Sequence, residues 1–104
     1  MNRYAFRMKL VSGQEAEYER RHAEIWPDLK AALHDAGVRD YSIWLDRPSG
    51  YLFALMHLEP SNTAIELPNH PVVKKWWLHM ADIMDTNADN SPVIVELMQV
   101  FHMD

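Results

Sequence analysis

The sequence predicts an α+β fold of the ferredoxin-like type, β-α-β-β-α-β, with both helices on one face of an antiparallel sheet. Three observations predict this fold. Strand-like segments lie near both ends of the chain, two stretches have helical periodicity, and a pair of strand-like segments joined by a short turn lies between those stretches. The length of 104 residues suits one core, so we expect a single domain over residues 1–104.

The first strand and the first helix follow from periodicity. Residues 3–11 alternate between apolar and polar side chains, which is typical of a half-buried strand. Ser12 and Glu15 have the spacing of a capping box, and an apolar stripe at helical intervals then continues to Gly37. Pro27 removes a backbone hydrogen bond inside this stretch, so we expect a kink or a restart at the residue before it.

The middle of the chain predicts a hairpin. Residues 38–46 and 50–59 are strand-like, and residues 47–50, Arg-Pro-Ser-Gly, form a turn in which Pro fixes φ and Gly accepts an unusual φ. Apolar residues occupy both faces of residues 50–59, as they do in the last segment, residues 93–102. We therefore expect a second subunit to cover the outer sheet face, in a face-to-face homodimer.

The second half completes the predicted order. The polar stretch 60–63 is compatible with a short helix. A long helix is expected over residues 71–84, with Asn69 or His70 near its cap. The β-branched and apolar residues 93–102 predict the last strand.

Composition excludes several classes of function. The formal net charge of −5, with dispersed Lys and Arg, provides no basic stripe for nucleic acid. No apolar run is long enough to span a membrane, and no signal peptide is visible. The absence of cysteine leaves no disulfide and no thiolate metal site, so we expect a cytoplasmic protein without membrane partners.

Metal and cofactor chemistry are also not expected. The six histidines have no zincin-type spacing, and the three glycines form no phosphate-binding loop. No serine or cysteine nucleophile with its own base is visible. The sequence therefore predicts no metal and no cofactor.

A group of aromatic side chains predicts a ligand cavity. Tyr18 and His22 are four residues apart on the inward stripe of the first helix. Tyr41 begins the second strand, and at least one of the adjacent Trp76 and Trp77 faces the same interior. Imidazole exchanges protons near neutral pH, while phenols and indoles offer hydrogen bonds and stacking surfaces without fixed charge. The group suits a small neutral polyol.

Four other residues receive simpler interpretations. Arg20 and Arg21 lie among glutamates and are interpreted as a solvated helix face. Trp26 and Trp44 are interpreted as packing residues.

Several segments together resemble the L-rhamnose mutarotase family, and the likeness runs from residue 3 to the last strand. The segments are Glu17-Tyr18-Glu19-Arg20-Arg21-His22, Ile25-Trp26-Pro27, Tyr41 before Ile43, Leu45-Asp46, Trp76-Trp77 with Met80, and Asp89-Asn90-Ser91-Pro92-Val93. Only the stretch 61–70 is less typical of the family.

The resemblance implies a dimeric α+β barrel and an isomerase, an aldose anomerase of L-rhamnose metabolism that acts without metal or cofactor. It implies that His22 is the proton donor and that Tyr18, Tyr41, Trp76 and Trp77 contact the sugar. Two alternatives stay open from the residues alone: a cofactor-independent monooxygenase on a similar barrel, and a non-catalytic sugar-binding module. Preference among hexoses, and any contribution of the second subunit to the site, also stay open.

Overall fold

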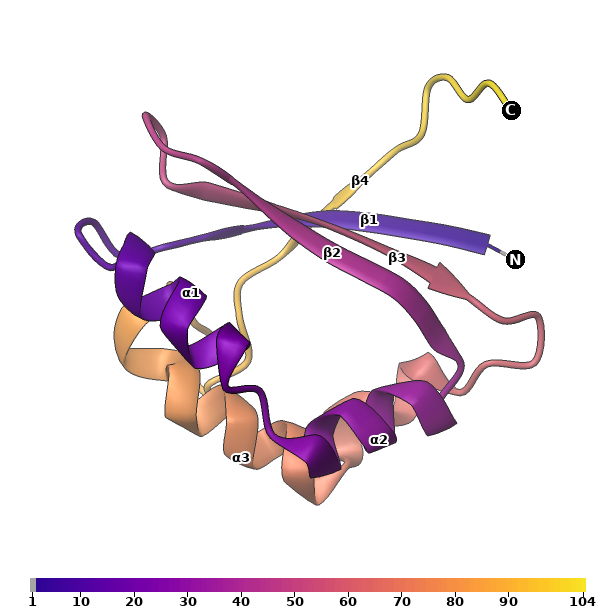
Figure 1. Ribbon diagram of the computed structural model, residues 1–104, viewed down its shortest axis with the longest axis horizontal. Coiled ribbons are helices and arrows are strands. Elements are labelled where there is room, and N and C mark those ends of the chain that lie inside the picture. The colour runs from indigo at the N-terminus through magenta and orange to yellow at the C-terminus, as the bar shows by residue number, and fades with distance from the viewer. Residues whose placement is uncertain (1) are drawn as a thin grey trace.

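The computed structural model describes residues 2–104 and places a sheet above a layer of helices (Figure 1). The elements are β1 (Asn2–Lys9), α1 (Glu15–Ala23), α2 (Pro27–Asp35), β2 (Val38–Asp46), β3 (Tyr51–Leu58), η1 (Ala64–Asn69), α3 (Pro71–Met80), η2 (Ala81–Ile83) and β4 (Val95–Leu97). The η segments are 3₁₀ helices. None of the helices in this described part of the chain is both long and apolar enough to cross a membrane.

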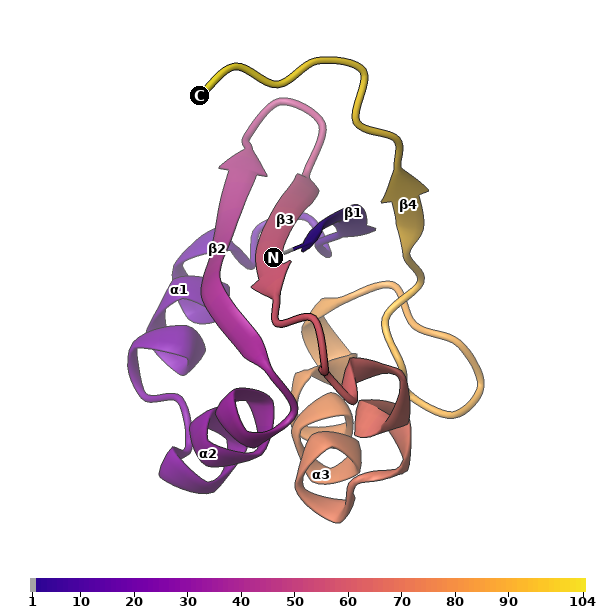
Figure 2. The ribbon, with the colours of Figure 1, turned by 90° about the vertical axis from the view of Figure 1, so that its right-hand side faces the viewer.

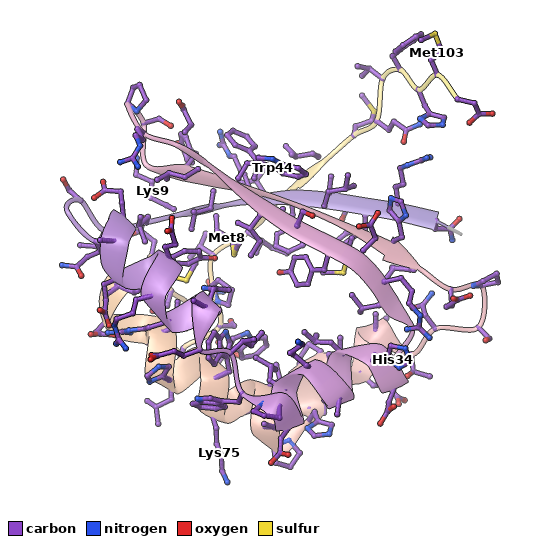
Figure 3. The ribbon with its side chains drawn as sticks, in the orientation of Figure 1. Met8, Lys9, His34, Trp44, Lys75 and Met103 are labelled. Carbon is purple, nitrogen blue, oxygen red and sulfur yellow. The ribbon has the colours of Figure 1, made fainter. Side chains whose placement is uncertain are left out.

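The described residues form a four-stranded antiparallel sheet in the order β2-β3-β1-β4, and the two views agree that the helices lie on one side of it (Figure 2). This arrangement confirms the predicted ferredoxin-like fold. The alternation in β1 places Phe6 and Met8 in the core. Figure 3 shows Met8 on the helix side of the sheet and Trp44 on the opposite side.

The predicted first helix is divided in two. α1 ends at Ala23 and α2 starts at Pro27, with Trp26 in an extended conformation (ψ 132°) as its cap. A proline disfavours the helical conformation of the residue before it and is well suited to the first helical position, so the predicted restart is confirmed. The predicted capping box is wrong, because Ser12 belongs to the preceding turn and Gln14 occupies the cap without a side-chain hydrogen bond.

α3 begins as predicted. The side chain of His70 accepts a hydrogen bond from the backbone N–H of Val72 at 3.2 Å and so caps the helix. The regular helix ends at Met80, and the remaining predicted residues continue mainly as the tighter η2. The predicted short helix appears as η1, a few residues later than expected.

The last strand is much shorter than predicted. Only Val95–Leu97 pairs with the sheet, opposite Ala5–Arg7 of β1, and the chain then leaves the sheet (Figure 1). Alternation predicts an extended chain but not a neighbouring strand, and residues 98–104 diverge from the edge of β1. The prediction of a paired strand over residues 93–102 is therefore wrong outside these three residues.

Candidate active site

A cavity of about 850 Å³ lies between the inner face of the sheet and the helices. All five residues predicted to act on a ligand line it: Tyr18 and His22 from α1, Tyr41 from β2, and Trp76 and Trp77 from α3. Buried apolar side chains such as Met8 and Leu52 form its floor against the sheet. The fold thus brings the predicted group together from three elements that are distant in sequence.

His22 is held on one side and free on the other. Its Nδ1 lies 3.1 Å from the backbone carbonyl oxygen of Tyr18. Because a carbonyl only accepts, Nδ1 carries the proton in this contact, which leaves Nε2 of the neutral ring with a lone pair. Desolvation lowers the pKa of His22, and the hydrogen bond to Tyr18 opposes that shift. The ring is therefore poised to accept a proton at neutral pH.

The two tyrosines have the opposite tendency. Burial raises the pKa of Tyr18, and its proximity to Tyr41 adds to that shift. Burial also raises the pKa of Tyr41 to about 12, although 37% of the residue's surface is exposed. Both phenols therefore keep their protons and can act as hydrogen-bond donors.

A β-bulge places Tyr41. The register of β2 against β3 shifts between Arg39 and Ser42, and Asp40 adopts a φ of 47° within the shift. The extra residue redirects the side chains that follow, and Tyr41 lines the cavity. Bulges often serve to direct a side chain into a site.

Aromatic rings continue the cavity wall from α1 to α3. Tyr18 stacks on His22 with ring centroids 4.3 Å apart, and Trp76 meets His22 edge-on at 5.4 Å. Trp76 is buried and Trp77 half-buried, and both indoles line the cavity. Trp26 contacts Trp76 edge-on at 5.1 Å, which confirms it as a packing residue.

Two interpretations of single residues were wrong. Trp44 is 57% exposed on the outer sheet face and does not pack in the core. Arg21 does not lie on a solvated face: its side chain is 11% exposed and bonds to the end of α3, whereas Arg20 is exposed as expected. The sequence held no signal for this difference, because both arginines have glutamates at helical spacing.

Within residues 2–104, no group of three or more His, Asp or Glu side chains is close enough together to hold a metal ion. The arrangement offers one imidazole that accepts and returns a proton, two protonated phenols, and indole faces that can stack on a small ring. The fold and the cavity define an α+β domain with a neutral histidine in an aromatic-lined cavity.

Comparison with known proteins narrows this class. Residues 3–103 match the family model described as L-rhamnose mutarotase. The L-rhamnose mutarotase of Brucella anthropi is 61% identical over 101 residues, which cover 97% of this chain and 95% of that protein. The corresponding protein of Agrobacterium fabrum is 54% identical over 103 residues, covering 99% and 96%.

A solved structure agrees with these sequence matches. The crystal structure of an L-rhamnose mutarotase from Formosa agariphila superimposes with a TM-score of 0.94, at 46% identity, with full coverage of both chains. The chain belongs to the L-rhamnose mutarotase family.

Proposed function

We propose that this protein is an isomerase that interconverts the α and β anomers of L-rhamnopyranose, with residues 1–104 acting as one L-rhamnose mutarotase domain. The observation that carries the proposal is the cavity that His22, with its Nδ1 held by the Tyr18 carbonyl, lines together with Tyr18, Tyr41 and the tryptophan pair. Family membership favours this activity over a monooxygenase or a non-catalytic sugar-binding module.

The proposed reaction opens and recloses the pyranose ring. In opening, Nε2 of neutral His22 accepts the proton of the anomeric hydroxyl while a donor protonates the ring oxygen, which gives the open-chain aldehyde. After rotation about C1–C2, the C5 hydroxyl attacks the other face of the carbonyl and returns its proton to the deprotonated donor, while the imidazolium donates its proton to the carbonyl oxygen. His22 is thus the proton donor of the closing step, and the site returns to its starting state.

The other residues supply the donor and hold the sugar. Tyr18 or Tyr41 can donate a proton to the ring oxygen, because burial raises the pKa values of both phenols and so keeps them protonated at neutral pH. Trp76 and Trp77 present indole surfaces to the apolar side of the ring and its methyl group. Acid–base help of about 10² to 10⁴-fold is sufficient for a reaction that already proceeds slowly in water.

Proton NMR saturation transfer between the α and β anomeric signals of L-rhamnose tests the activity directly. Transfer is expected only with catalytic amounts of the protein, and His22→Ala should lower the rate by about 10² to 10⁴-fold while binding, followed by tryptophan fluorescence, is retained. His57→Ala is the matched control, because His57 lies on β3 away from the cavity lining. Unchanged exchange in His22→Ala would show that the assigned acid–base group is wrong.

We also propose a homodimer. Trp44 and Phe53 are cross-strand neighbours on the outer sheet face, and both are exposed, as are Val95 and Leu97 at the β4 edge. Residues 98–104 add further exposed apolar side chains, Met98, Val100, Phe101 and Met103. Arg7 lies between Phe53 and Val95, but exposed apolar side chains in this number on a small domain mark an interface, and the second copy would cover it.

We further propose that the protein acts in the cytoplasm. A chain without cysteine has no need of an oxidising compartment, and free L-rhamnose is the only small molecule the proposed reaction requires.

A further inference from the structure

Arg21 bridges the two helices that carry the proposed active-site residues. Its Nη1 donates to the backbone carbonyl of His79 at 2.8 Å and to Asp82 Oδ1 at 2.8 Å, and its Nη2 reaches Asp82 Oδ2 at 3.2 Å. Its Nε donates to Glu17 Oε2 at 2.6 Å, one turn earlier on α1. The guanidinium therefore uses three of its nitrogens on fixed acceptors in two parts of the fold.

The acceptors lie at the end of α3. His79 is in the last turn of this helix, where backbone carbonyls have no partner within the helix, and Asp82 follows in η2. A cation at a helix C-terminus also interacts favourably with the helix dipole. Arg21 thus caps α3 from α1, while the bidentate pair with Asp82 fixes the orientation of the cap.

Arg20 makes a useful contrast. It also pairs with Glu17, and with Glu24 at 2.6 Å, but both partners belong to α1 or its cap. Its side chain is 56% exposed against 11% for Arg21. Arg20 and Arg21 thus both pair with Glu17, but only Arg21 also reaches the end of α3.

We propose that Arg21 is a positioning residue, which locks α1 onto the end of α3 and thereby sets the placement of His22 relative to Trp76. His22 follows Arg21 on α1, and Trp76 lies one turn before His79 on α3, so the Arg21 bridge and the contact of the two rings at 5.4 Å connect the same helices. The inference rests on the proposed function for its catalytic consequence. The claim that Arg21 holds α1 against α3 does not depend on the proposed function.

Positioning of this kind affects turnover more than binding. Trp76, Trp77 and Tyr41 lie outside α1, so most of the proposed sugar contacts stay in place in an Arg21 variant, whereas His22 and Tyr18 move with α1. Displacements of about 1 Å can cost about 100-fold in rate. Loosening α1 should therefore lower kcat and leave KM nearly unchanged.

The experiment compares Arg21→Gln with the matched control Arg20→Gln in the full chain. Arg21→Gln is expected to lower kcat for anomer exchange by about 10-fold or more with KM within about 2-fold, while Arg20→Gln keeps both values. Arg21→Lys should recover part of kcat, because an ammonium can reach one of the acceptors but cannot form the bidentate pair. Asp82→Asn gives a second route to the same loss should Arg21→Gln fold poorly.

A spectroscopic readout separates this inference from the proposed activity. The ring protons of His22 lie against Tyr18 and Trp76, so their NMR chemical shifts report the placement of the imidazole. These shifts should change in Arg21→Gln and Asp82→Asn and stay constant in Arg20→Gln. Unchanged His22 shifts and kcat in the two bridge variants would overturn the inference. An inactive wild-type protein with the predicted shift changes would instead refute only the proposed function.

Discussion

His22 determines the pH dependence expected of this site. In the proposed reaction, the imidazole must be neutral to accept the anomeric proton, and desolvation lowers its pKa below the ordinary value of 6.5. The neutral form therefore predominates at pH 7 and is lost only as the pH falls through the lowered pKa. We expect kcat/KM to decrease toward acid pH as His22 becomes protonated, with a midpoint below its ordinary pKa of 6.5.

The measurement is the rate of anomer exchange as a function of pH, corrected for the uncatalysed rate. The midpoint of the acid limb should lie below 6.5 and coincide with the NMR titration of His22. The tyrosines contribute no transition in this range, because burial raises their pKa values. An acid midpoint above 6.5 would show that the histidine is not desolvated as described.

At the scale of residues, the sequence predicted which side chains share a helix face better than it predicted which residues they contact in other elements. Tyr18 and His22 were predictable together because helical spacing places them on one face. The bridge of Arg21 was not, because it joins residues about sixty positions apart and depends on how α1 meets α3. Local periodicity defines a face of a helix but not which element that face meets.

At the scale of elements, Gly37 ends α2 and supports the turn into β2. Its φ of 95° lies in the region that glycine adopts readily, and an added Cβ would lie 2.7 Å from Asn62 Cβ. Gly13 has a similar φ of 85° but nothing within 4 Å of an added Cβ. An alanine at Gly13 therefore introduces backbone strain alone, whereas an alanine at Gly37 introduces both backbone strain and a steric clash.

We expect Gly13→Ala to lower the free energy of unfolding by about 1 to 2 kcal/mol through backbone strain alone. Gly37→Ala should lower the free energy of unfolding by about 1 to 3 kcal/mol more than Gly13→Ala does, because the backbone around Asn62 must shift. Urea denaturation of both variants measures the difference. An equal decrease in the free energy of unfolding for both variants would indicate that the segment around Asn62 moves without destabilising the fold.

The elements also show which parts of the fold are local. The break before Pro27 and the cap at His70 were predictable because each depends on neighbouring residues. The length of β4 was not, because pairing requires the edge of β1, which lies far away in sequence. An extended pattern in residues 98–104 is compatible with pairing to any edge or to none.

At the scale of the whole molecule, the proposed homodimer depends on the outer sheet face. Cross-strand neighbours form an apolar row there, with Trp44 opposite Phe53 on the β2–β3 pair and Leu97 opposite Ala5 on the β1–β4 pair. Stable dimers bury about 1,200 to 2,000 Å² in total, and a four-stranded face extended by an apolar tail is adequate for such an area. Arg7 of β1 lies between Phe53 and Val95 on this face, whereas Trp44 has Phe53 as its apolar neighbour, so a polar substitution at Trp44 should weaken an interface there.

Trp44→Glu tests the dimer. Trp44 is 57% exposed in one chain, so the substitution costs little in the monomer, but two carboxylates in a buried apolar interface carry a large desolvation penalty. We expect sedimentation at micromolar concentration to give a dimer mass for the wild type and a monomer mass for Trp44→Glu. Ile65→Glu is the control, because Ile65 is 89% exposed on η1, away from the sheet, and should leave the mass unchanged. A monomeric wild type would refute the dimer, and the apolar face would then need another partner.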